Sequence, residues 1–157
     1  MLAVYPGSYD PITNGHVDII ERGRKIFDRL IIAVLMNPAK QPLFTLEERI
    51  DVLRELYPPD TGIVVEAFDG LLIDFAATRK ADVIVRGIRY VSDFEYEFQM
   101  ALMNRRLDER IETVFMLPSE SYSYVSSRLV KEIFQFGGSV SGLVPDCVER
   151  RLKSRVT

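Results

Sequence analysis

Five short apolar runs recur along the chain, and each is followed by a longer stretch in which apolar and polar residues alternate with helical spacing. Apolar runs of about four to eight residues, bounded by Pro, Gly or charged residues, are typical of buried strands. The run over 30–36 contains no polar residue, which indicates a central strand of a parallel sheet with both faces covered. We therefore predict strands over 2–5, 30–36, 63–68, 82–86 and 112–117.

Helices are predicted between and after these strands. Thr45 and Glu48 form a capping-box pattern, which marks a helix start, and Gly137 and Gly138 mark a helix end. Because strands and helices alternate, the pattern predicts an α/β fold: a Rossmann-like, doubly wound, five-stranded parallel sheet with helices on both faces and a C-terminal helical segment. The predicted helices run from 13 or 14 to about 27, over about 45–56, 71–79 and 93–106, and onward from 126 and from 145.

The length of 157 residues is that of one domain. We predict a single domain over 1–157, with about 1–118 as the sheet core and about 119–157 as a C-terminal loop and helices. A net charge of −3 argues against a protein devoted to nucleic acid or membrane surfaces, and no apolar run approaches the ~18 residues of a membrane span. The single cysteine, Cys147, cannot form an internal disulfide, fits a reducing cytosol, and is interpreted as structural.

The expected ligand site lies at one edge of this sheet. In doubly wound sheets, ligands bind at the carboxyl ends of the strands, where the winding direction reverses. The loops that leave those ends are therefore expected to form one site; they contain Ser8, Lys40, Leu71, the stretch 86–89 and the stretch 122–128.

The only histidine, His16, falls in the first turn of the first predicted helix, directly after a strand and a glycine-bearing loop. The backbone N–H groups and the dipole of a helix N-terminus favour an anion, and an imidazole there can donate a further hydrogen bond. Gly15 allows a phosphate to approach the backbone closely. A lone histidine is usually an ordinary surface or core residue, so it is the strand–loop–helix context that predicts phosphate binding here.

Three basic residues are predicted at the same edge. Lys40 follows a central strand, in a loop that contains two prolines, and its position alone leaves a plain surface lysine equally open. Arg86 and Arg89 flank Gly87 at the end of another buried strand, and guanidinium groups match phosphate oxygens geometrically. Ion pairing with the acidic residues over 93–97 is the structural alternative, and both roles can hold together.

A second helix start near this edge carries Ser126 and Ser127. Ordinary N-capping explains serines there, and the same geometry forms a second phosphate cradle. Several familiar motifs are absent from the sequence: there is no G-x-x-x-x-G-K-[ST] P-loop, no G-x-G-x-x-G fingerprint and no Cys/His cluster for a transition metal.

Four motifs together resemble one known family. They are T-N-G-H over 13–16, K-x-P-L-F-T-L-E-E-R over 40–49, R-G-I-R over 86–89 followed by D-F-E-Y-E over 93–97, and S-S-R-L-V-K-E over 126–132. In this combination the chain resembles the bacterial phosphopantetheine adenylyltransferases, within the nucleotidyltransferases that share a [HT]-x-G-H motif. T-x-G-H indicates only the superfamily, whereas the R-G-I-R and D-F-E-Y-E block is more specific. The resemblance extends from Tyr5 to about Glu149.

This resemblance implies transfer of AMP from ATP to 4′-phosphopantetheine, giving dephospho-coenzyme A and pyrophosphate, the penultimate step of coenzyme A biosynthesis. It implies Mg²⁺ as cofactor, held through substrate phosphates without a protein ligand. It also implies a homohexamer in the bacterial cytoplasm. The acceptor's own phosphate is the nucleophile, so no enzyme nucleophile is expected.

The resemblance also implies roles for individual residues. His16 is expected to bind ATP and stabilise the transition state, with Lys40 and Arg89 as further catalytic groups. The family more often has Phe at the position of Tyr9, and many members have Ser at that of Arg128. The expected phosphopantetheine contacts are Ser8, Lys40, Leu72 and Arg86. The expected ATP contacts are Ser8, Tyr9, His16, Gly87, Ile88, Arg89, Glu97, Tyr122, Ser123, Tyr124, Val125, Ser126, Ser127 and Arg128.

Three other functions stay open. Another nucleotidyltransferase of the same fold, of the nicotinamide-mononucleotide or glycerol-3-phosphate type, would take a different acceptor. A non-catalytic nucleotide sensor would bind ATP without releasing pyrophosphate. An interaction module would rest on the apolar residues over 94–107, which we expect instead to pack against the core and form a subunit contact. Among these, only the pantetheine acceptor needs the apolar lining expected from Leu71, Leu72, Met100 and Met103.

Overall fold

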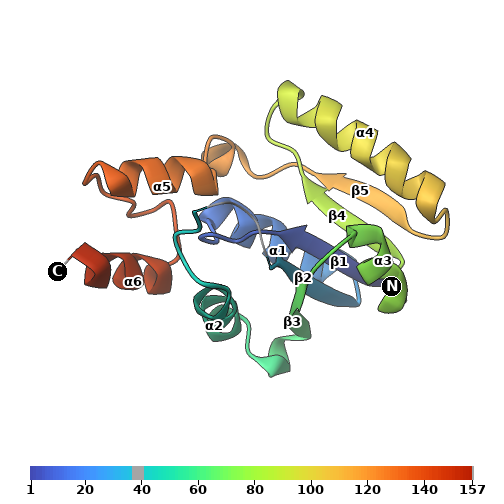
Figure 1. The fold of residues 1–157 in the computed structure, drawn as a ribbon, viewed down its shortest axis with the longest axis horizontal. Coiled ribbons are helices and arrows are strands. Elements are labelled where there is room, and N and C mark those ends of the chain that lie inside the picture. Colours follow the sequence, from blue (N-terminus) through green and yellow to red (C-terminus); the bar gives the residue numbers. More distant parts are fainter. Residues whose placement is uncertain (37–40, 157) are drawn as a thin grey trace.

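The computed structural model describes residues 1–36 and 41–156, and of residues 91 and 92 only the backbone. Strands and helices alternate as predicted, and the observed boundaries lie within two residues of most predicted ones (Figure 1). The strands are β1 (Leu2–Gly7), β2 (Arg29–Leu35), β3 (Ile63–Phe68), β4 (Val83–Gly87) and β5 (Glu112–Met116). The α-helices are α1 (Asn14–Ile26), α2 (Leu46–Leu56), α3 (Leu72–Thr78), α4 (Val91–Leu107), α5 (Ser127–Gln135) and α6 (Asp146–Val156).

Two helix starts follow the capping signals in the sequence. The side chain of Thr45 accepts a hydrogen bond from the N–H of Glu48 at the start of α2. The side chain of Ser126 likewise accepts from the N–H of Leu129 at the start of α5. Each cap satisfies a backbone donor that the helix itself leaves unpaired, so these boundaries are determined locally.

All five strands are parallel, in the order β3-β2-β1-β4-β5, which confirms the predicted doubly wound sheet. The winding reverses between β1 and β4, whose pairing is limited to Ala3 with Val83 and Val4 with Ile84. β1 runs past the predicted end at Tyr5 through Pro6, which has no N–H to donate. Pro6 is accommodated because it lies beyond the point where β1 stops pairing with β4, and that separation opens the edge of the sheet.

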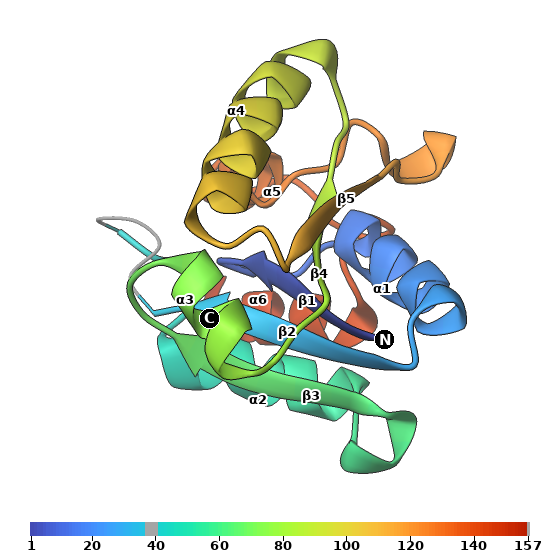
Figure 2. The same cartoon turned by 90° about the vertical axis from the view of Figure 1, so that its right-hand side faces the viewer.

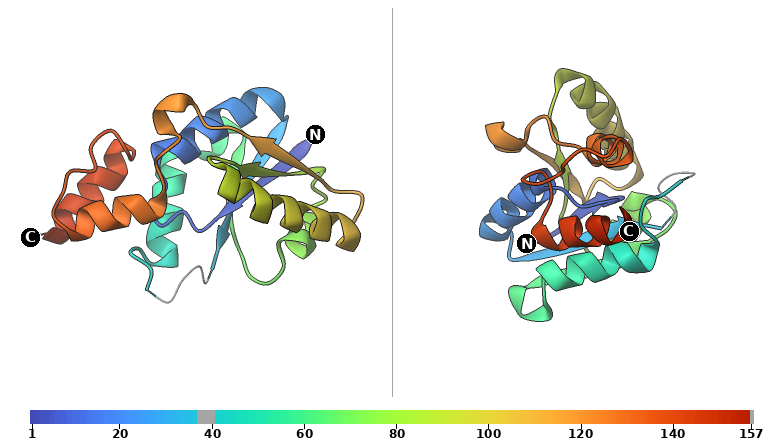
Figure 3. Two further views of the ribbon diagram at one scale, coloured as in Figure 1. Left: turned by 90° about the horizontal axis from the view of Figure 1, so that it is seen from above. Right: turned by 90° about the vertical axis from the view of Figure 1, so that its left-hand side faces the viewer.

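The two faces of the sheet are covered by different helices (Figures 2 and 3). In β2, Leu30, Ile32 and Val34 point into the larger core cluster, which also contains buried residues of α1, α2, α5 and α6. Ile31 and Ala33 point to the opposite face, against α3. This alternation accounts for the unbroken apolar run in the sequence, because both faces of a central parallel strand are buried.

The prediction that the apolar residues of α4 pack against the core is wrong for most of that helix. Phe94, Phe98, Leu102 and Met103 are each between 45% and 52% exposed, and the buried side chains of α4 with a described environment include the polar Glu97 and Asn104. The helix stands at the outer edge of the β4–β5 half of the sheet (Figure 2). Within the described ranges, no helix is long and apolar enough to span a bilayer.

Candidate active site

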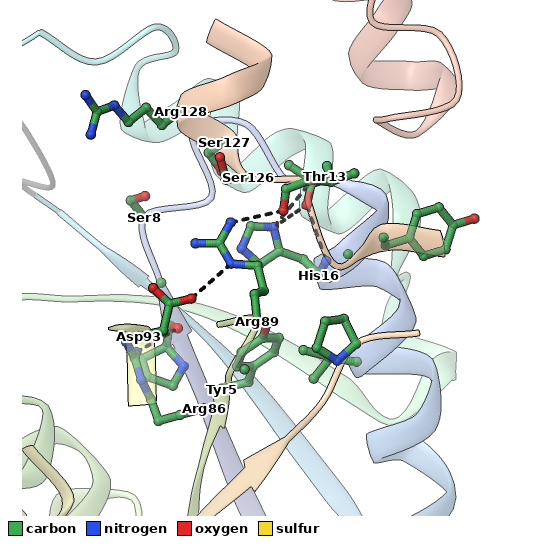
Figure 4. Close-up of a pocket in the computed structure, with 18 of the residues that line it drawn as sticks. Tyr5, Ser8, Thr13, His16, Arg86, Arg89, Asp93, Ser126, Ser127 and Arg128 are labelled. Carbon is green, nitrogen blue, oxygen red and sulfur yellow. Dashed lines mark hydrogen bonds and ion pairs between the residues drawn. The ribbon is translucent and has the colours of Figure 1, made fainter. Parts of the chain in front are cut away.

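A pocket of about 330 Å³ lies at the carboxyl ends of β1 and β4, between the starts of α1 and α5 (Figure 4). Its position is the point of strand reversal where doubly wound sheets bind ligands, and its volume is in the range of small-molecule sites. Most of the expected site residues are brought together in its lining: Ser8, His16, Arg86, Gly87, Arg89, Glu97, Tyr122, Val125, Ser126, Ser127 and Arg128.

His16 takes part in a capping box at the start of α1. The side chain of Thr13 accepts a hydrogen bond from the N–H of His16, and Nδ1 of His16 accepts one from the N–H of Thr13, at 3.0 Å. An imidazole nitrogen that accepts an N–H carries no proton, so the neutral ring has its proton on Nε2. The pKa of His16 is lowered from 6.5 to about 4, mainly by burial and in smaller part by the positive charges of Arg89 and Arg86. His16 is therefore a neutral N–H donor at physiological pH.

Two tyrosine rings lie beside the imidazole. The ring centroid of Tyr9 lies 5.0 Å from that of His16, and the centroid of Tyr5 lies 6.3 Å from it. Tyr9 is 2% exposed, has a positive φ of 50°, and donates its hydroxyl hydrogen bond to the carbonyl oxygen of Tyr5 at 2.8 Å. Its side chain is absent from the lining described for the pocket, so it supports His16 rather than facing a ligand.

Arg86 is held by a buried carboxylate. Its Nε and Nη2 donate to the two carboxylate oxygens of Glu97 at 2.7 and 2.6 Å, and Nη1 donates to the carbonyl oxygen of Pro6 at 3.4 Å. Although burial disfavours the charge of Arg86, the ion pair with Glu97 outweighs it and raises the pKa of the guanidinium. A bidentate pair of this kind fixes the orientation of the arginine in the absence of any ligand.

Arg89 reaches the same pocket from the segment after β4. Its Nε lies 3.5 Å from a carboxylate oxygen of Asp93, and its Nη1 donates to the carbonyl oxygen of Val125 at 3.1 Å. Figure 4 shows Arg89 and His16 converging from different elements. The site thus combines two permanently charged donors with one neutral donor, which suits a ligand carrying several phosphoryl oxygens.

The start of α5 forms the opposite side of the pocket. Ser126 caps the helix, and the hydroxyl of Ser127 donates to the carbonyl oxygen of Pro11 at 2.7 Å, which ties α5 to the loop before α1. Two helix N-termini therefore face one pocket. The side chain of Arg128 is 91% exposed and extends from the rim into solvent, 3.7 Å from Glu132 (Figure 4).

Several expected contacts lie elsewhere. Ile88 is buried in the core, the hydroxyl of Ser123 donates to the carbonyl of Glu120, and Tyr124 is 54% exposed. Leu72 packs against the core cluster beneath α3, away from the pocket lining. The apolar lining expected from the leucines after β3 and the methionines of α4 is likewise missing from this pocket, because Leu71, Met100 and Met103 are exposed. Lys40 lies outside the described residues.

Two buried charged residues that the sequence analysis did not single out support the loops of the site. Asp10 is fully buried; its carboxylate accepts from the N–H groups of Leu43 and Phe44 at 2.8 and 2.7 Å and pairs with Lys131 of α5 at 2.8 Å. Arg49, 2% exposed, donates to the carbonyl oxygens of Ser8 at 2.8 Å and Leu35 at 2.9 Å. Asp10 precedes the T-N-G-H motif and Arg49 ends the L-F-T-L-E-E-R motif, which was the available signal.

The carboxylates facing the pocket do not form a free metal site. Asp93 and Glu97 line it, and each is engaged by an arginine. Among residues 1–36 and 41–156, no group of three or more His, Cys, Asp or Glu side chains could hold a metal ion.

Comparison with known proteins identifies the family of this chain. The family described as cytidylyltransferase-like matches residues 4–133. The phosphopantetheine adenylyltransferase of Desulfosudis oleivorans is 53% identical over 155 residues, covering 99% of this chain and 92% of that protein. The phosphopantetheine adenylyltransferase of Caldanaerobacter subterraneus is 54% identical over 154 residues, covering 98% of this chain and 96% of that protein.

A solved structure supports the fold independently. A crystal structure from Vibrio parahaemolyticus, assigned as a nicotinate-nucleotide adenylyltransferase, matches with a TM-score of 0.67 at 18% identity, covering 98% of this chain and 91% of the other. At that identity the likeness shows the fold alone. Sequence identity above 50% over nearly the whole length carries the family assignment: the chain belongs to the cytidylyltransferase-like family and, within it, to the phosphopantetheine adenylyltransferases.

Proposed function

We propose that this chain transfers the adenylyl group of ATP to 4′-phosphopantetheine, giving dephospho-coenzyme A and pyrophosphate, the penultimate step of coenzyme A biosynthesis. Its family membership supports the reaction. The observation that carries the chemistry is the neutral His16, whose Nδ1 is occupied by the N–H of Thr13 and whose Nε2–H is available in a pocket flanked by Arg86 and Arg89.

The mechanism follows from these residue types. A phosphate oxygen of the acceptor attacks the α-phosphorus of ATP in line, the bond to the pyrophosphate oxygen breaks, and the leaving group departs with the negative charge. The protein supplies position and charge neutralisation, which are the main contributions to phosphoryl-type transfer. His16 Nε2–H donates to a non-bridging oxygen as negative charge develops, while the two arginines bind phosphoryl oxygens.

The described serines have no role as nucleophiles in this scheme. The hydroxyl of Ser127 donates to a backbone carbonyl, and the hydroxyl of Ser126 accepts the cap hydrogen bond. We propose that the acceptor is bound by Ser8, Lys40, Leu72 and Arg86, and that ATP occupies the side formed by His16, the segment 87–89, Glu97 and the segment 122–128. For contact with Leu72, the pantetheine arm of the acceptor would have to extend beyond the described pocket towards α3.

Mg²⁺ is proposed as the cofactor, carried by the phosphates of ATP. The ion-paired state of Asp93 and Glu97 supports this, since neither carboxylate is free to act as a ligand. When bound, Mg²⁺ neutralises phosphate charge, and the two arginines and His16 bind the remaining phosphoryl oxygens.

We also propose a homohexamer in the cytoplasm, where ATP is available. The exposed apolar side chains of α4 support self-association, because a row that includes Phe94, Phe98 and Leu102 is unusual on a monomer surface. Six copies of the 18.0 kDa chain would give a particle of about 108 kDa.

The experiment that tests the reaction measures pyrophosphate release from purified protein with ATP and Mg²⁺, with and without 4′-phosphopantetheine. Release only with this acceptor is expected. Parallel reactions with nicotinamide mononucleotide or glycerol 3-phosphate distinguish other nucleotidyltransferases of the fold. If the protein bound ATP but released no pyrophosphate with any acceptor, the proposal would be contradicted, and a non-catalytic nucleotide sensor would be the remaining function.

A further inference from the structure

Tyr5 is a pocket residue that neither the sequence motifs nor the mechanism above uses. It lies in β1, and its ring belongs to the core cluster beneath α1 with 5% of its surface exposed. It nevertheless lines the pocket, and Figure 4 shows its ring rising from β1 towards Arg89. Its hydroxyl oxygen lies 3.5 Å from the position that a Cβ on Gly87 would take, so this group faces the end of β4.

The three most buried tyrosine hydroxyls of the chain differ in their partners. The hydroxyl of Tyr9 donates to a backbone carbonyl. The hydroxyl of Tyr57 is enclosed and has no partner in the described parts of the chain. The hydroxyl of Tyr5 has no protein partner among the described side chains and backbone either, but it borders the pocket instead of being enclosed. Buried donors are almost always satisfied, so this one is available to a ligand.

The surroundings keep this hydroxyl protonated and bring anions to it. Burial raises the pKa of Tyr5 well above its ordinary value, and the opposing charges of Arg86 and Arg89 do not cancel that effect. The same two arginines attract phosphate into the pocket. Gly87 keeps the approach open, because a Cβ there would lie 2.7 Å from Cδ1 of Ile19 and against the hydroxyl of Tyr5.

We propose that the hydroxyl of Tyr5 is a further substrate-binding group of this site, a neutral donor that hydrogen-bonds a phosphate oxygen of the bound nucleotide. It stands beside His16, with ring centroids 6.3 Å apart, so the site combines two neutral donors with the two charged ones. Naming the phosphate as that of ATP rests on the proposed function. The presence of a phosphoryl ligand at this hydroxyl rests on the pocket alone.

The test compares Tyr5→Phe with Tyr57→Phe. Each substitution removes a buried hydroxyl that has no described protein partner and retains the ring, so both variants should keep the urea unfolding midpoint of the parent protein or exceed it. Tyr57 lies at the end of α2, outside the pocket lining, and is the matched control. Tyr5→Phe should lower kcat/KM for ATP by about 10- to 100-fold, the range for a lost hydrogen bond to a charged group. Tyr57→Phe should leave it within about twofold.

Each result decides the question. Unchanged kcat/KM in Tyr5→Phe would overturn the proposal, and so would an equal loss in both variants, which would indicate a structural effect. If the parent protein binds ATP but releases no pyrophosphate with any acceptor, the proposed function fails while this inference remains testable. In that case the Kd for ATP, measured by calorimetry, decides: a rise of about 10- to 100-fold confined to Tyr5→Phe supports the contact, and an unchanged Kd removes it.

Discussion

Nδ1 of His16 lies 3.0 Å from the backbone nitrogen of Thr13 and accepts its N–H, so a residue that lines the pocket also closes the cap of its own helix. One nitrogen of the ring is thereby used by the cap, which leaves Nε2–H for the donor role proposed above. The cap explains how a single histidine in the first turn of a helix keeps a defined tautomer and orientation without a carboxylate partner.

Substitution of His16 separates these two roles. His16→Glu retains a capping-box residue at the third helical position, so its stability should stay close to that of the parent protein, while kcat should fall by at least about 10²–10³-fold because a carboxylate accepts hydrogen bonds and has no N–H to donate to a phosphate. His16→Ala should lose the same activity and, in addition, about 0.5–2 kcal/mol of stability. Steady-state kinetics and urea unfolding measure the two effects. Equal stability of both variants would contradict a capping role for the ring.

The protonation of His16 can be read directly, because a tag-free protein contains one histidine. Nitrogen NMR should show the Nε2–H tautomer and a pKa of about 4. The folded pKa lies below the ordinary 6.5, so the folded state binds fewer protons between these values. The resulting stabilisation is complete above pH 6.5 and is lost as the pH falls to 4, by at most about 1.4 kcal/mol per pH unit. An NMR titration midpoint near 6.5 would refute this assignment.

The partly buried pair of Arg86 and Glu97 should be energetically coupled. A double-mutant cycle with Arg86→Met and Glu97→Gln, followed by urea unfolding, is expected to give a coupling energy of about 1–3 kcal/mol. The matched control is the pair of Arg105 and Glu112, whose side chains are 60% and 63% exposed at a comparable distance of 3.0 Å. That exposed pair should couple by less than about 1 kcal/mol. Similar values for both pairs would mean that burial does not strengthen the first.

Removal of divalent cations should affect turnover without affecting the free protein. With excess EDTA, pyrophosphate release should stop, whereas the Tm measured without ATP should stay the same, because the described carboxylates at the pocket are engaged by arginines. Differential scanning calorimetry with and without EDTA measures the second effect. A fall in the Tm of the ATP-free protein on chelation would indicate a metal bound by the protein itself.

The exposed face of α4 should mediate assembly. Phe94 and Phe98 form a stacked pair of rings 5.7 Å apart. Replacing both with Glu puts two charges in their place and should reduce the mass found by light scattering from about 108 kDa towards 18.0 kDa. Phe136→Glu is the control: Phe136 is 90% exposed directly after the last residue of α5, and its substitution should leave the mass unchanged. An intact particle in the double variant would place the interface elsewhere.

The sequence by itself determined the alternating elements, the parallel sheet, the helix starts at Thr45 and Ser126, and the position of His16 in the first turn of a helix, because each depends on residues within a few positions of one another. The family resemblance rests on motifs of the same kind. The tertiary structure alone decided which side chains meet. It showed Tyr5 at the pocket, Leu72 and Ile88 away from it, and α4 exposed. It also showed that the carboxylate of Asp10 accepts hydrogen bonds from the N–H groups of Leu43 and Phe44, which lie more than thirty residues further along the chain. Burial and pairing of these groups depend on contacts between distant segments, which no local pattern of polarity encodes.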